Sequence, residues 1–554
     1  MESRFVNSLV KVFEDSELDV AGLREATALR GEVYSLQFAF RSDLRLDRLT
    51  AEVDSPLAEF IRIRRVESVP VRYFGPKFDA DILRNTPGLY PDLLTELAEF
   101  RFPAFQWHAL WITIRVPRTL VPGSYPLQLR LRNDDLLKQE WNTSFESEVF
   151  MLHVLPPVLP EQTLLRTEWL HTDCVFGHYD LIPWSEEHWT MQERYFRNMT
   201  AHGINVVYTP LFTPPLDTQI GGERPTAQLV RVIEENGVYR FDFSHLERWI
   251  RLAKRSGFRA FELSHLFTQW GARFTPKIII EHNGMEEKRF GWHIAADSAE
   301  YRNFLDTFLP RLRDFLRQQE IEADCLVHIS DEPHPEHLES YAAAVALVRK
   351  HLDGMKFLDA LSDPDFYEKG LVGIPVPGSD HLADFERFML PERWVYYCCS
   401  QWNRVSNQFI HFPSCRNRIM GVLMYVAEVQ GFLQWGYNFY HSQFSRHPVD
   451  PYRDTEAGGG FPGGDSFKVY PGPDGPEDSI RHEVFFEGLQ DMRALQLLES
   501  LVGREETVAF VVEAAGCLPD MCNYPRSPEW LPAFREALNR KLAKLTASAH
   551  PEKP

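Results

Sequence analysis

The first 155 or so residues alternate apolar and polar side chains, and this period of two predicts β-strands with one buried face. Clear examples are the runs 33–38, 109–116 and 125–131, which turn-forming residues separate from one another. Because each half-buried strand needs a second sheet to cover its apolar side, we expect an antiparallel β-sandwich over residues 1–158. The proline-rich run 155–160 then forms a stiff connector, since proline disfavours both helix and sheet interiors.

From residue 161 onward the pattern changes to short apolar runs, each followed by an amphipathic helical stretch. Strands are expected to begin near Leu164, Ile204, Phe258, Asp324, Lys356, Val372, Arg393 and Gly431. Helices are expected over residues 187–199, 246–254, 301–318 and 337–351, with an eighth barrel helix over 480–498. These eight units predict an α/β fold, a (β/α)8 TIM-like barrel over residues 161–502. A doubly wound open sheet is the competing architecture, and residues 503–554 are expected to form a small C-terminal helical cap.

Composition and charge exclude several classes of protein. The 554 residues are 44% hydrophobic and 25% charged, which is typical of a folded chain. Lys and Arg together number 59 against 79 Asp and Glu, so a net charge of −20 disfavours binding to nucleic acid or anionic lipid. No apolar run approaches the roughly 18 residues of a membrane span, and the N-terminus lacks an export signal. We therefore expect a cytoplasmic protein with neither a nucleic-acid nor a membrane partner.

The cysteines argue against disulfides and against a cysteine-based metal site. They form no paired CxxC motif of the kind that zinc sites use. They are Cys174, Cys325, Cys398, Cys399, Cys415, Cys517 and Cys522. Because dispersed reduced thiols are ordinary in the cytosol, we predict no structural disulfide, no metal and no cofactor.

In a (β/α)8 barrel, function lies at the carboxy ends of the strands. Polar and aromatic residues collect at the expected strand ends: His171, Asp173, His265, Trp270, Asp359, Tyr397, Trp435, Tyr437 and Asn438. Aromatic rings stack on the CH faces of sugars, while carboxylates and amides bind the hydroxyls, so this set predicts a carbohydrate site. For each residue taken alone, the alternative is an aromatic that fills the core or a polar group that caps a helix.

The strongest single signal is the tripeptide Asp331-Glu332-Pro333 at the end of the fourth strand. Two adjacent carboxylates cannot both ionise easily, so one should keep a proton and act as an acid near neutral pH. Pro333 disfavours a helical Glu332, and we expect it to hold the pair extended. The competing interpretation is a helix start with acidic residues at the positive end of the helix dipole.

Several segments resemble one known family. They are 328–333 (HISDEP), 394–398 (WVYYC), 431–437 (GFLQWGY), 464–465 (GD), 469–472 (VYPG) and 479–481 (SIR). Together they extend from about residue 160 to 500 and are similar to the domain of unknown function 4091 family, which is related to glycoside hydrolase family 123, the β-N-acetylgalactosaminidases. Gln434 and Gly463 depart from the family pattern, which bears on the choice of sugar more than on the chemistry.

The resemblance implies an exo-acting β-N-acetylgalactosaminidase with a substrate-assisted retaining mechanism, in which the 2-acetamido oxygen of the substrate attacks the anomeric carbon. Asp331 would orient the acetamido N–H and stabilise its developing charge. Glu332 would protonate the leaving oxygen and later deprotonate water. Trp435 would form a platform for the sugar, and Tyr397 would bind the acetamido oxygen.

Three other functions stay open from the sequence. The first is a glycosidase for an N-acetylglucosaminide or for a sugar without an acetamido group. The second is a non-catalytic carbohydrate-binding barrel. The third is a metal-dependent enzyme that uses His171, Asp173, His265 and Glu332, which no compact motif such as HExxH supports. The expected partner in the first two is a glycan or a small glycoside, and the sequence leaves open whether the chain forms a homodimer.

Overall fold

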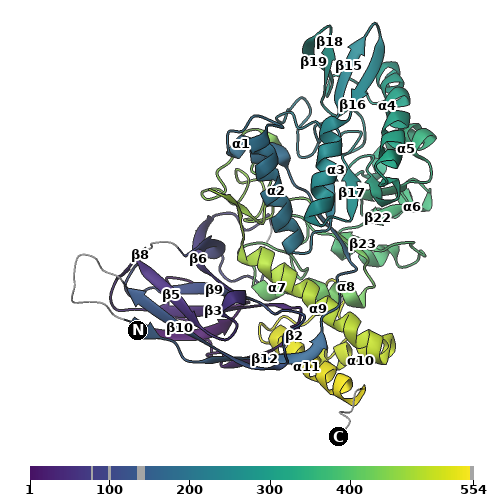
Figure 1. Ribbon diagram of the computed structural model, residues 1–554. Coiled ribbons are helices and arrows are strands. Elements are labelled where there is room, and N and C mark those ends of the chain that lie inside the picture. Colours follow the sequence, from purple (N-terminus) through teal and green to yellow (C-terminus); the bar gives the residue numbers. More distant parts are fainter. Residues whose placement is uncertain (77–78, 98–100, 134–143, 550–554) are drawn as a thin grey trace. The chain divides into compact units, whose positions relative to one another are not determined.

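The computed structural model describes residues 1–76, 79–97, 101–133 and 144–549 (Figure 1). The contacts within the chain divide it into two units. The first unit comprises Met1–Gln162, Trp402–Ala427 and Glu477–Pro554, and the second comprises Thr163–Gln401 and Glu428–Pro476. The division into three domains at residues 158 and 502 stays a prediction.

Two β-sheets build the N-terminal part of the first unit. One has the strand order β1-β3-β9-β6-β7, the other has the order β11-β10-β12-β2, and β5 also pairs with β10. These strands are β1 (Glu2–Asn7), β2 (Glu25–Arg30), β3 (Val33–Arg41), β5 (Leu49–Asp54), β6 (Ile61–Val71), β7 (Gly88–Glu96), β9 (Trp107–Arg115), β10 (Gly123–Asn133), β11 (Ser144–Glu146) and β12 (Phe150–Val158). The short strands β4 (Leu46–Asp47) and β8 (Arg101–Phe102) form a separate pair.

The two sheets share one buried cluster, to which Phe38 and Ile112 contribute from one sheet and Leu129 and Leu152 from the other. This common core is what the alternating pattern requires, because each strand turns every second side chain inward. The expected antiparallel pairing is confirmed with one exception, since β12 pairs with β2 in parallel.

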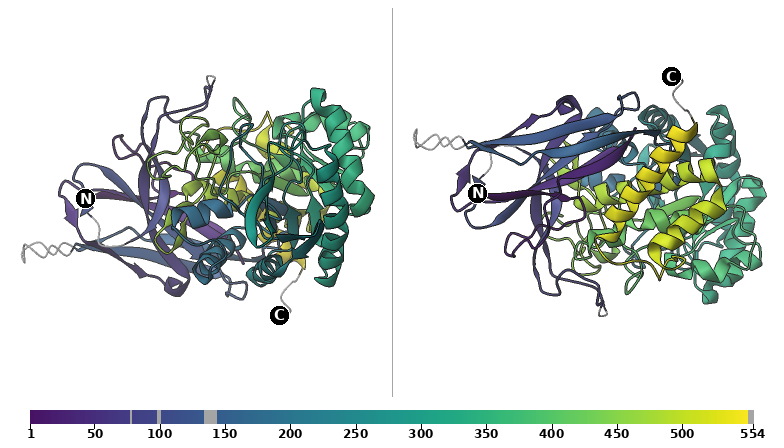
Figure 2. Two further views of the ribbon diagram at one scale, coloured as in Figure 1. Left: turned by 90° about the horizontal axis from the view of Figure 1, so that it is seen from above. Right: turned by 90° about the horizontal axis from the view of Figure 1, so that it is seen from below.

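In the described part of the first unit there are also five α-helices: α7 (Ser414–Arg418), α8 (Met420–Val426), α9 (Ile480–Val502), α10 (Arg504–Ala515) and α11 (Trp530–Ala549). The Ser479 side chain caps α9 by accepting a hydrogen bond from the backbone N–H of His482. The helices α8, α10 and α11 all pack against α9, and Figure 2 shows α9, α10 and α11 as one group. The helical cap expected beyond residue 503 is thus present as α10 and α11.

The second unit is built on a ring of eight parallel strands, and all eight lie where the sequence predicts them. In ring order they are β13 (Leu165–Glu168), β14 (Val206–Thr209), β17 (Ala260–Leu263), β20 (Cys325–Val327), β21 (Lys356–Ala360), β22 (Ile374–Val376), β23 (Trp394–Tyr396) and β24 (Gly431–Gln434). The ring is nearly closed, because a single parallel bridge between Gly378 and Tyr396 joins the β22 and β23 edges. The open-sheet alternative is therefore wrong.

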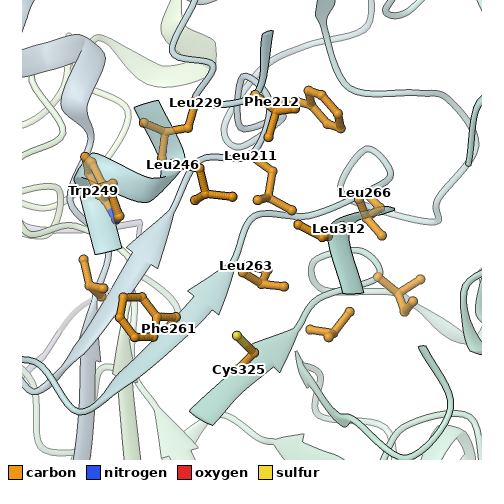
Figure 3. Packing of buried hydrophobic residues seen from close by; sticks show 14 of the residues in the cluster. Leu211, Phe212, Leu229, Leu246, Trp249, Phe261, Leu263, Leu266, Leu312 and Cys325 are labelled. Carbon is orange, nitrogen blue, oxygen red and sulfur yellow. The ribbon is translucent and has the colours of Figure 1, made fainter. Parts of the chain in front are cut away.

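The strands of the ring separate two hydrophobic layers. All eight contribute to one cluster, in which Tyr208, Leu326 and Leu433 fill the interior of the ring. Alternate apolar residues of β14, β17, β20 and β21 belong to a second cluster between the strands and the surrounding helices. Figure 3 shows part of this outer layer, where Phe261 of β17 and Cys325 of β20 lie on neighbouring strands. Side chains alternate between the inside and the outside of the barrel along each strand. Only the inward-facing ones can therefore reach the pocket at the carboxy end of the barrel.

Helices follow the strands of the ring as expected: α1 (Thr172–His178), α2 (Glu186–Ala201), α3 (Ser244–Ser256), α4 (Ala299–Gln318), α5 (Leu338–Leu352) and α6 (Asp365–Glu368). The second unit also carries a small four-stranded sheet that the sequence analysis does not anticipate, with the order β16-β15-β18-β19. Its strands are β15 (Arg231–Glu235), β16 (Val238–Asp242), β18 (Ile278–His282) and β19 (Met285–Phe290), and a further hairpin joins β25 (Tyr470–Gly472) to β26 (Gly475–Glu477). None of the helices in the described part of the chain has the length and apolarity needed to cross a bilayer.

Candidate active site

Asp331 and Glu332 lie just beyond the carboxy end of β20, where backbone hydrogen bonds from both sides fix them. The Trp270 N–H donates to the carbonyl of Asp331 at 2.8 Å, and the Glu332 N–H donates to the carbonyl of Ala360 at 3.0 Å. The expectation of an extended pair is wrong at one residue, because Glu332 has φ of 45° and lies in the left-handed region. Its bond to the end of β21 holds this turn, although Pro333 favours an extended conformation for the residue before it. A non-glycine residue in this region is strained, as is common at functional sites.

The two carboxylates line a pocket of about 390 Å³ at the carboxy end of the barrel. This volume lies in the range of small-molecule sites. Among the other lining residues are Asp217, Gln269, Trp270, Tyr396, Cys398, Cys399, Trp435, Phe444 and Phe461. Aromatic rings and carboxylates therefore share one cavity, which is the combination that the strand-end residues predict.

The two carboxylates of the pair influence each other. Burial and the neighbouring charge of Glu332 raise the pKa of Asp331 well above its ordinary value. The Tyr396 hydroxyl donates a hydrogen bond of 2.7 Å to Oε1 of Glu332. Burial and the adjacent carboxylate therefore favour the protonated form of Asp331.

A buried charge network lies directly beneath the pair. His328 bonds through Nε2 to Glu262 at 2.5 Å and through Nδ1 to Asp359 at 2.9 Å. Burial alone would lower the pKa of His328, but these two carboxylates raise it to about 10. The Trp169 indole N–H donates to Glu262 at 2.8 Å, and the Tyr341 hydroxyl donates to Asp359. A fixed imidazolium therefore supports the strand that presents Asp331 and Glu332.

The aromatic side of the pocket is formed by Trp435, whose ring meets Phe461 edge-on at 5.1 Å. Its indole N–H donates to Oδ2 of Asp465 at 3.3 Å, which fixes the plane of the ring. Gln434 holds the turn that carries Trp435, because its side chain accepts from the Gly436 N–H and donates to the Asp465 carbonyl. Gln434, one of the two positions that depart from the family pattern, thus stabilises the turn that carries Trp435.

Another corner of the pocket contains a third carboxylate, Asp217. The Phe444 N–H donates to its Oδ2 at 2.9 Å, and burial raises its pKa to about 6. Asp217, Phe444 and Trp270 all have positive φ, and the rings of Trp270 and Phe444 meet edge-on. Within the described residues Asp217 has no cationic partner at ion-pair distance, so its other oxygen is available to a ligand.

Comparison with known protein families identifies the family of the chain. The model of the family described as "Glycoside hydrolase 123, catalytic domain" matches residues 169–498. The chain belongs to glycoside hydrolase family 123.

The solved structures that are similar to this glycosidase include a family 123 glycoside hydrolase from Clostridium perfringens, described in terms of glycolipid glycan hydrolysis. The two share 15% identity over 100% of this chain and 99% of the other, with a TM-score of 0.74, which confirms the fold. A family 5 glycoside hydrolase from Bacteroides vulgatus matches with a TM-score of 0.32, at 11% identity over 63% of this chain and 69% of the other. The search of curated proteins found no match.

Of the residues expected to contact the sugar, Trp270 and Trp435 line the pocket of the glycosidase. The others lie outside its lining: His171, Asp173, His265, Asp359, Tyr397, Tyr437 and Asn438. All seven are buried and engaged with other parts of the protein. Contact of these seven residues with the sugar stays a prediction, which their burial outside the pocket lining does not support.

His171 and Asp173 form a buried ion-pair cluster. Arg224 donates two hydrogen bonds to Asp173, at 2.7 and 3.0 Å, and one of 3.0 Å to His171. His441 also bonds to Asp173 at 3.1 Å, and Asn438 bonds to the backbone of His171. This cluster ties the loop after β13 to the loop after β24 and so shapes the pocket indirectly.

His265 and Asp359 lie below the carboxylate pair. The ring of His265 lies 4.2 Å from that of His328, and burial lowers its pKa well below the ordinary value, so it is neutral beside the imidazolium. Asp359 accepts from His328 and Tyr341. Both residues support the strand end from below.

Tyr397 and Tyr437 point away from the pocket. Tyr397 packs edge-on against Phe432, on the outer side of the ring of strands. The Tyr437 hydroxyl donates to Asn198 of α2 at 2.8 Å. Tyr396, the residue before Tyr397, occupies the cavity instead. The alternation of Trp394, Tyr396 and Cys398 in the barrel interior is the signal that could have identified it.

Two groups in the second unit have potential metal-ligand geometry within the described residues. They are Asp173, Cys174 and His441, and His265, His328 and Asp359. In each group protein partners already neutralise the charges: Arg224 binds Asp173, and carboxylates engage both nitrogens of His328. The four residues of the metal-dependent alternative, His171, Asp173, His265 and Glu332, do not form one ligand cluster in the part of the chain that the structure covers.

Proposed function

We propose that this glycosidase is an exo-acting β-N-acetylgalactosaminidase that uses the acetamido group of its substrate as the nucleophile. The observation that carries the proposal is the adjacency of Asp331 and Glu332 in one pocket. Glycosidases that supply their own nucleophile place two carboxyl groups about 5 Å or more apart, on opposite sides of the scissile bond. Neighbouring residues that share one proton serve the substrate-assisted reaction better, because both act on the same side of the sugar.

The two carboxylates have different roles in this mechanism. Burial and the charge of Glu332 raise the pKa of Asp331, which favours its protonated form. An acetamido N–H that donates to Asp331 would favour its carboxylate form, and the proton would pass to Glu332. Glu332 then protonates the glycosidic oxygen as the acetamido oxygen attacks the anomeric carbon, and it later deprotonates the water that opens the oxazolinium intermediate. Asp331 stabilises the positive charge on the acetamido nitrogen.

Tyr396 takes the role that the resemblance implies for its neighbour Tyr397. Its hydroxyl lies in the cavity and already bonds to Glu332, so it reaches the place where the acetamido group would lie. Trp435 provides a flat apolar surface for the sugar ring. Asp217 offers a free carboxylate oxygen for a sugar hydroxyl away from the reacting bond. A pocket of this size holds one sugar, which supports removal of terminal residues.

A panel of aryl glycosides tests the proposal. We expect hydrolysis of the aryl β-N-acetylgalactosaminide and inhibition by a thiazoline that mimics the cyclised intermediate. The matching aryl β-galactoside should react at least about a thousand-fold more slowly, because it lacks the intramolecular nucleophile and its high effective molarity. The rate for the aryl β-N-acetylglucosaminide, compared with that for the N-acetylgalactosaminide, measures the preference for the galacto configuration. Equal rates for the galactoside and the N-acetylgalactosaminide would contradict the mechanism.

A further inference from the structure

Cys398 and Cys399 form a pair of adjacent thiols inside the candidate active site. Both line the same pocket as Asp331, Glu332 and Tyr396. They are adjacent in the sequence, and neither forms a disulfide within the described residues. The proposed reaction uses neither of them.

A rigid turn after β23 holds the two thiols in place. The Cys398 N–H donates to Oε1 of Gln401 at 2.9 Å, and the Gln401 N–H returns a bond to the carbonyl of Cys398 at 3.2 Å. Gln401 is itself anchored, because its side-chain amide donates to Asp380 at 3.0 Å. This turn therefore fixes the backbone from which the Cys398 side chain enters the pocket.

We propose that Cys398 and Cys399 form a bidentate site for trivalent thiophilic reagents of the arsenoxide class, and that its occupation excludes the sugar. The reaction is R–As=O + 2 R′SH → R–As(SR′)2 + H2O, in which two As–S bonds form and both thiol protons leave with the oxide oxygen as water. It needs no oxidant. Exclusion of the sugar rests on the proposed function of the pocket, whereas binding of the arsenical does not.

The environment of the thiols favours a bidentate reagent over a simple alkylating one. The hydrogen bond with Cys399, burial and the charge of Glu332 together raise the pKa of Cys398 well above its ordinary value. A protonated, nearly buried thiol is a slow nucleophile. Once one As–S bond has formed, the second thiol belongs to the adjacent residue and lines the same pocket, so the second bond forms at a high effective concentration.

Intact-protein mass spectrometry with phenylarsine oxide tests the site. We expect one adduct per chain, which 2,3-dimercaptopropanol reverses and a monothiol does not. Cys398→Ser and Cys399→Ser should each weaken the adduct by about 100-fold, because each leaves a single thiol. Cys522→Ser, at an exposed cysteine elsewhere, should react like the wild type. Equal labelling of both pocket variants and the wild type would overturn the proposal.

Two further measurements link the adduct to the pocket. Free N-acetylgalactosamine should slow formation of the adduct. Wild-type protein that carries the adduct should lose aryl glycoside turnover, compared with the same protein before treatment. An adduct at Cys398 and Cys399 that leaves turnover intact would overturn the proposal. If the wild type hydrolyses no glycoside at all, the proposed function fails, while the mass measurement still decides whether the dithiol site exists.

Discussion

Among single residues, direct neighbours in the sequence differ in whether their side chains reach the pocket. Asp331, Glu332 and Tyr396 lie together in the cavity, whereas Tyr397 packs on the outer side of the same strand end. Adjacent residues of identical type thus occupy opposite environments. This contrast provides matched controls for testing each role.

The acid role of Glu332 predicts a dependence on the leaving group. Glu332→Gln should reduce kcat/KM by about 10²- to 10⁴-fold for a glycoside with a poorly acidic aglycone. The loss in kcat/KM should be much smaller for a dinitrophenyl glycoside, because the dinitrophenolate leaves without being protonated. Steady-state rates with both substrates check this, and Glu336→Gln, at an exposed carboxylate nearby, is the control. An equal loss with both leaving groups would contradict the acid role.

The two tyrosines give the sharpest pair of variants. Tyr396→Phe removes the hydroxyl that bonds to Glu332, and we expect kcat/KM to fall by about 10- to 100-fold, as for loss of a hydrogen bond to a charged group. Tyr397→Phe should leave kcat/KM within a few-fold of the wild type, because that side chain lies outside the pocket lining. A larger loss in Tyr397→Phe than in Tyr396→Phe would show that Tyr397, and not Tyr396, faces the pocket.

Asp217 predicts a pH-dependent contribution to substrate binding. Its pKa of about 6 means that it is ionised, and a strong hydrogen-bond acceptor, only above that pH. Asp217→Asn should therefore raise KM by roughly ten-fold at pH 7.5, and the difference from the wild type should shrink as the pH falls below 6. Asp450→Asn, at an exposed carboxylate, should change KM at neither pH. A KM ratio that stays constant from pH 5 to 8 would exclude this role.

At the scale of elements, the strand ends are supported by buried charge rather than by packing alone. His328, Glu262 and Asp359 connect β20 to the strands on either side of it, β17 and β21. The protonated His328 between these two carboxylates fixes the position of the strand end that carries Asp331 and Glu332. The energy of this arrangement depends on pH because one of its members titrates.

The stability of the fold should fall as the medium becomes alkaline. The pKa of His328 is about 10 in the folded protein against 6.5 as its ordinary value. A raised folded pKa stabilises the fold fully below pH 6.5, and this contribution is lost as the pH rises from 6.5 to 10. Urea unfolding at pH 6, 8 and 10 should show this decline.

His328→Gln serves as the test of that assignment. It should destabilise the protein by about 3–5 kcal/mol at pH 6, since it leaves two buried carboxylates without their cation, and the decline between pH 6.5 and 10 should become shallower. His447→Gln, at an exposed histidine, should keep the wild-type stability and slope. An unchanged slope in His328→Gln would show that another group causes the pH dependence.

The elements of the barrel could be predicted because their signals are local. Each strand carries its own apolar run, and helices such as α3 and α4 show a clear apolar face. The inserted sheet also had a local signal that the sequence analysis did not use. Asn236-Gly237 and Asn283-Gly284 both lie in the left-handed region between paired strands, as two-residue hairpin turns require.

The candidate site was only partly predictable, because its members depend on contacts between distant segments. The adjacency of Asp331 and Glu332 is visible in the sequence, but Asp217 enters the pocket through a bond to Phe444, which is 227 residues away. The pattern of apolar and polar residues along the sequence cannot predict a contact between segments so far apart. Likewise, Asp173 has the residue type of a sugar ligand, and only its pairing with Arg224 shows that the charge is used internally.

At the scale of the whole molecule, the chain combines a β-sheet unit with a barrel that carries the chemistry. Membership of family 123 makes it a glycoside hydrolase, and the similarity to a solved structure extends over the full length of the fold. The finer claim concerns the nucleophile. It distinguishes a substrate-assisted enzyme from one that supplies its own nucleophile, for which Asp217 is the remaining carboxylate among the pocket residues described above.

The most direct test of that claim is the turnover of aryl β-N-acetylgalactosaminides whose acetamido methyl carries zero, one, two or three fluorine atoms. Fluorine withdraws electron density from the acetamido oxygen without removing the sugar contacts. If that oxygen is the nucleophile, kcat should fall steeply with each added fluorine, as transition-state charge moves onto the acetamido group. Values of kcat that do not change across the series would contradict the account, because the nucleophile would then belong to the protein.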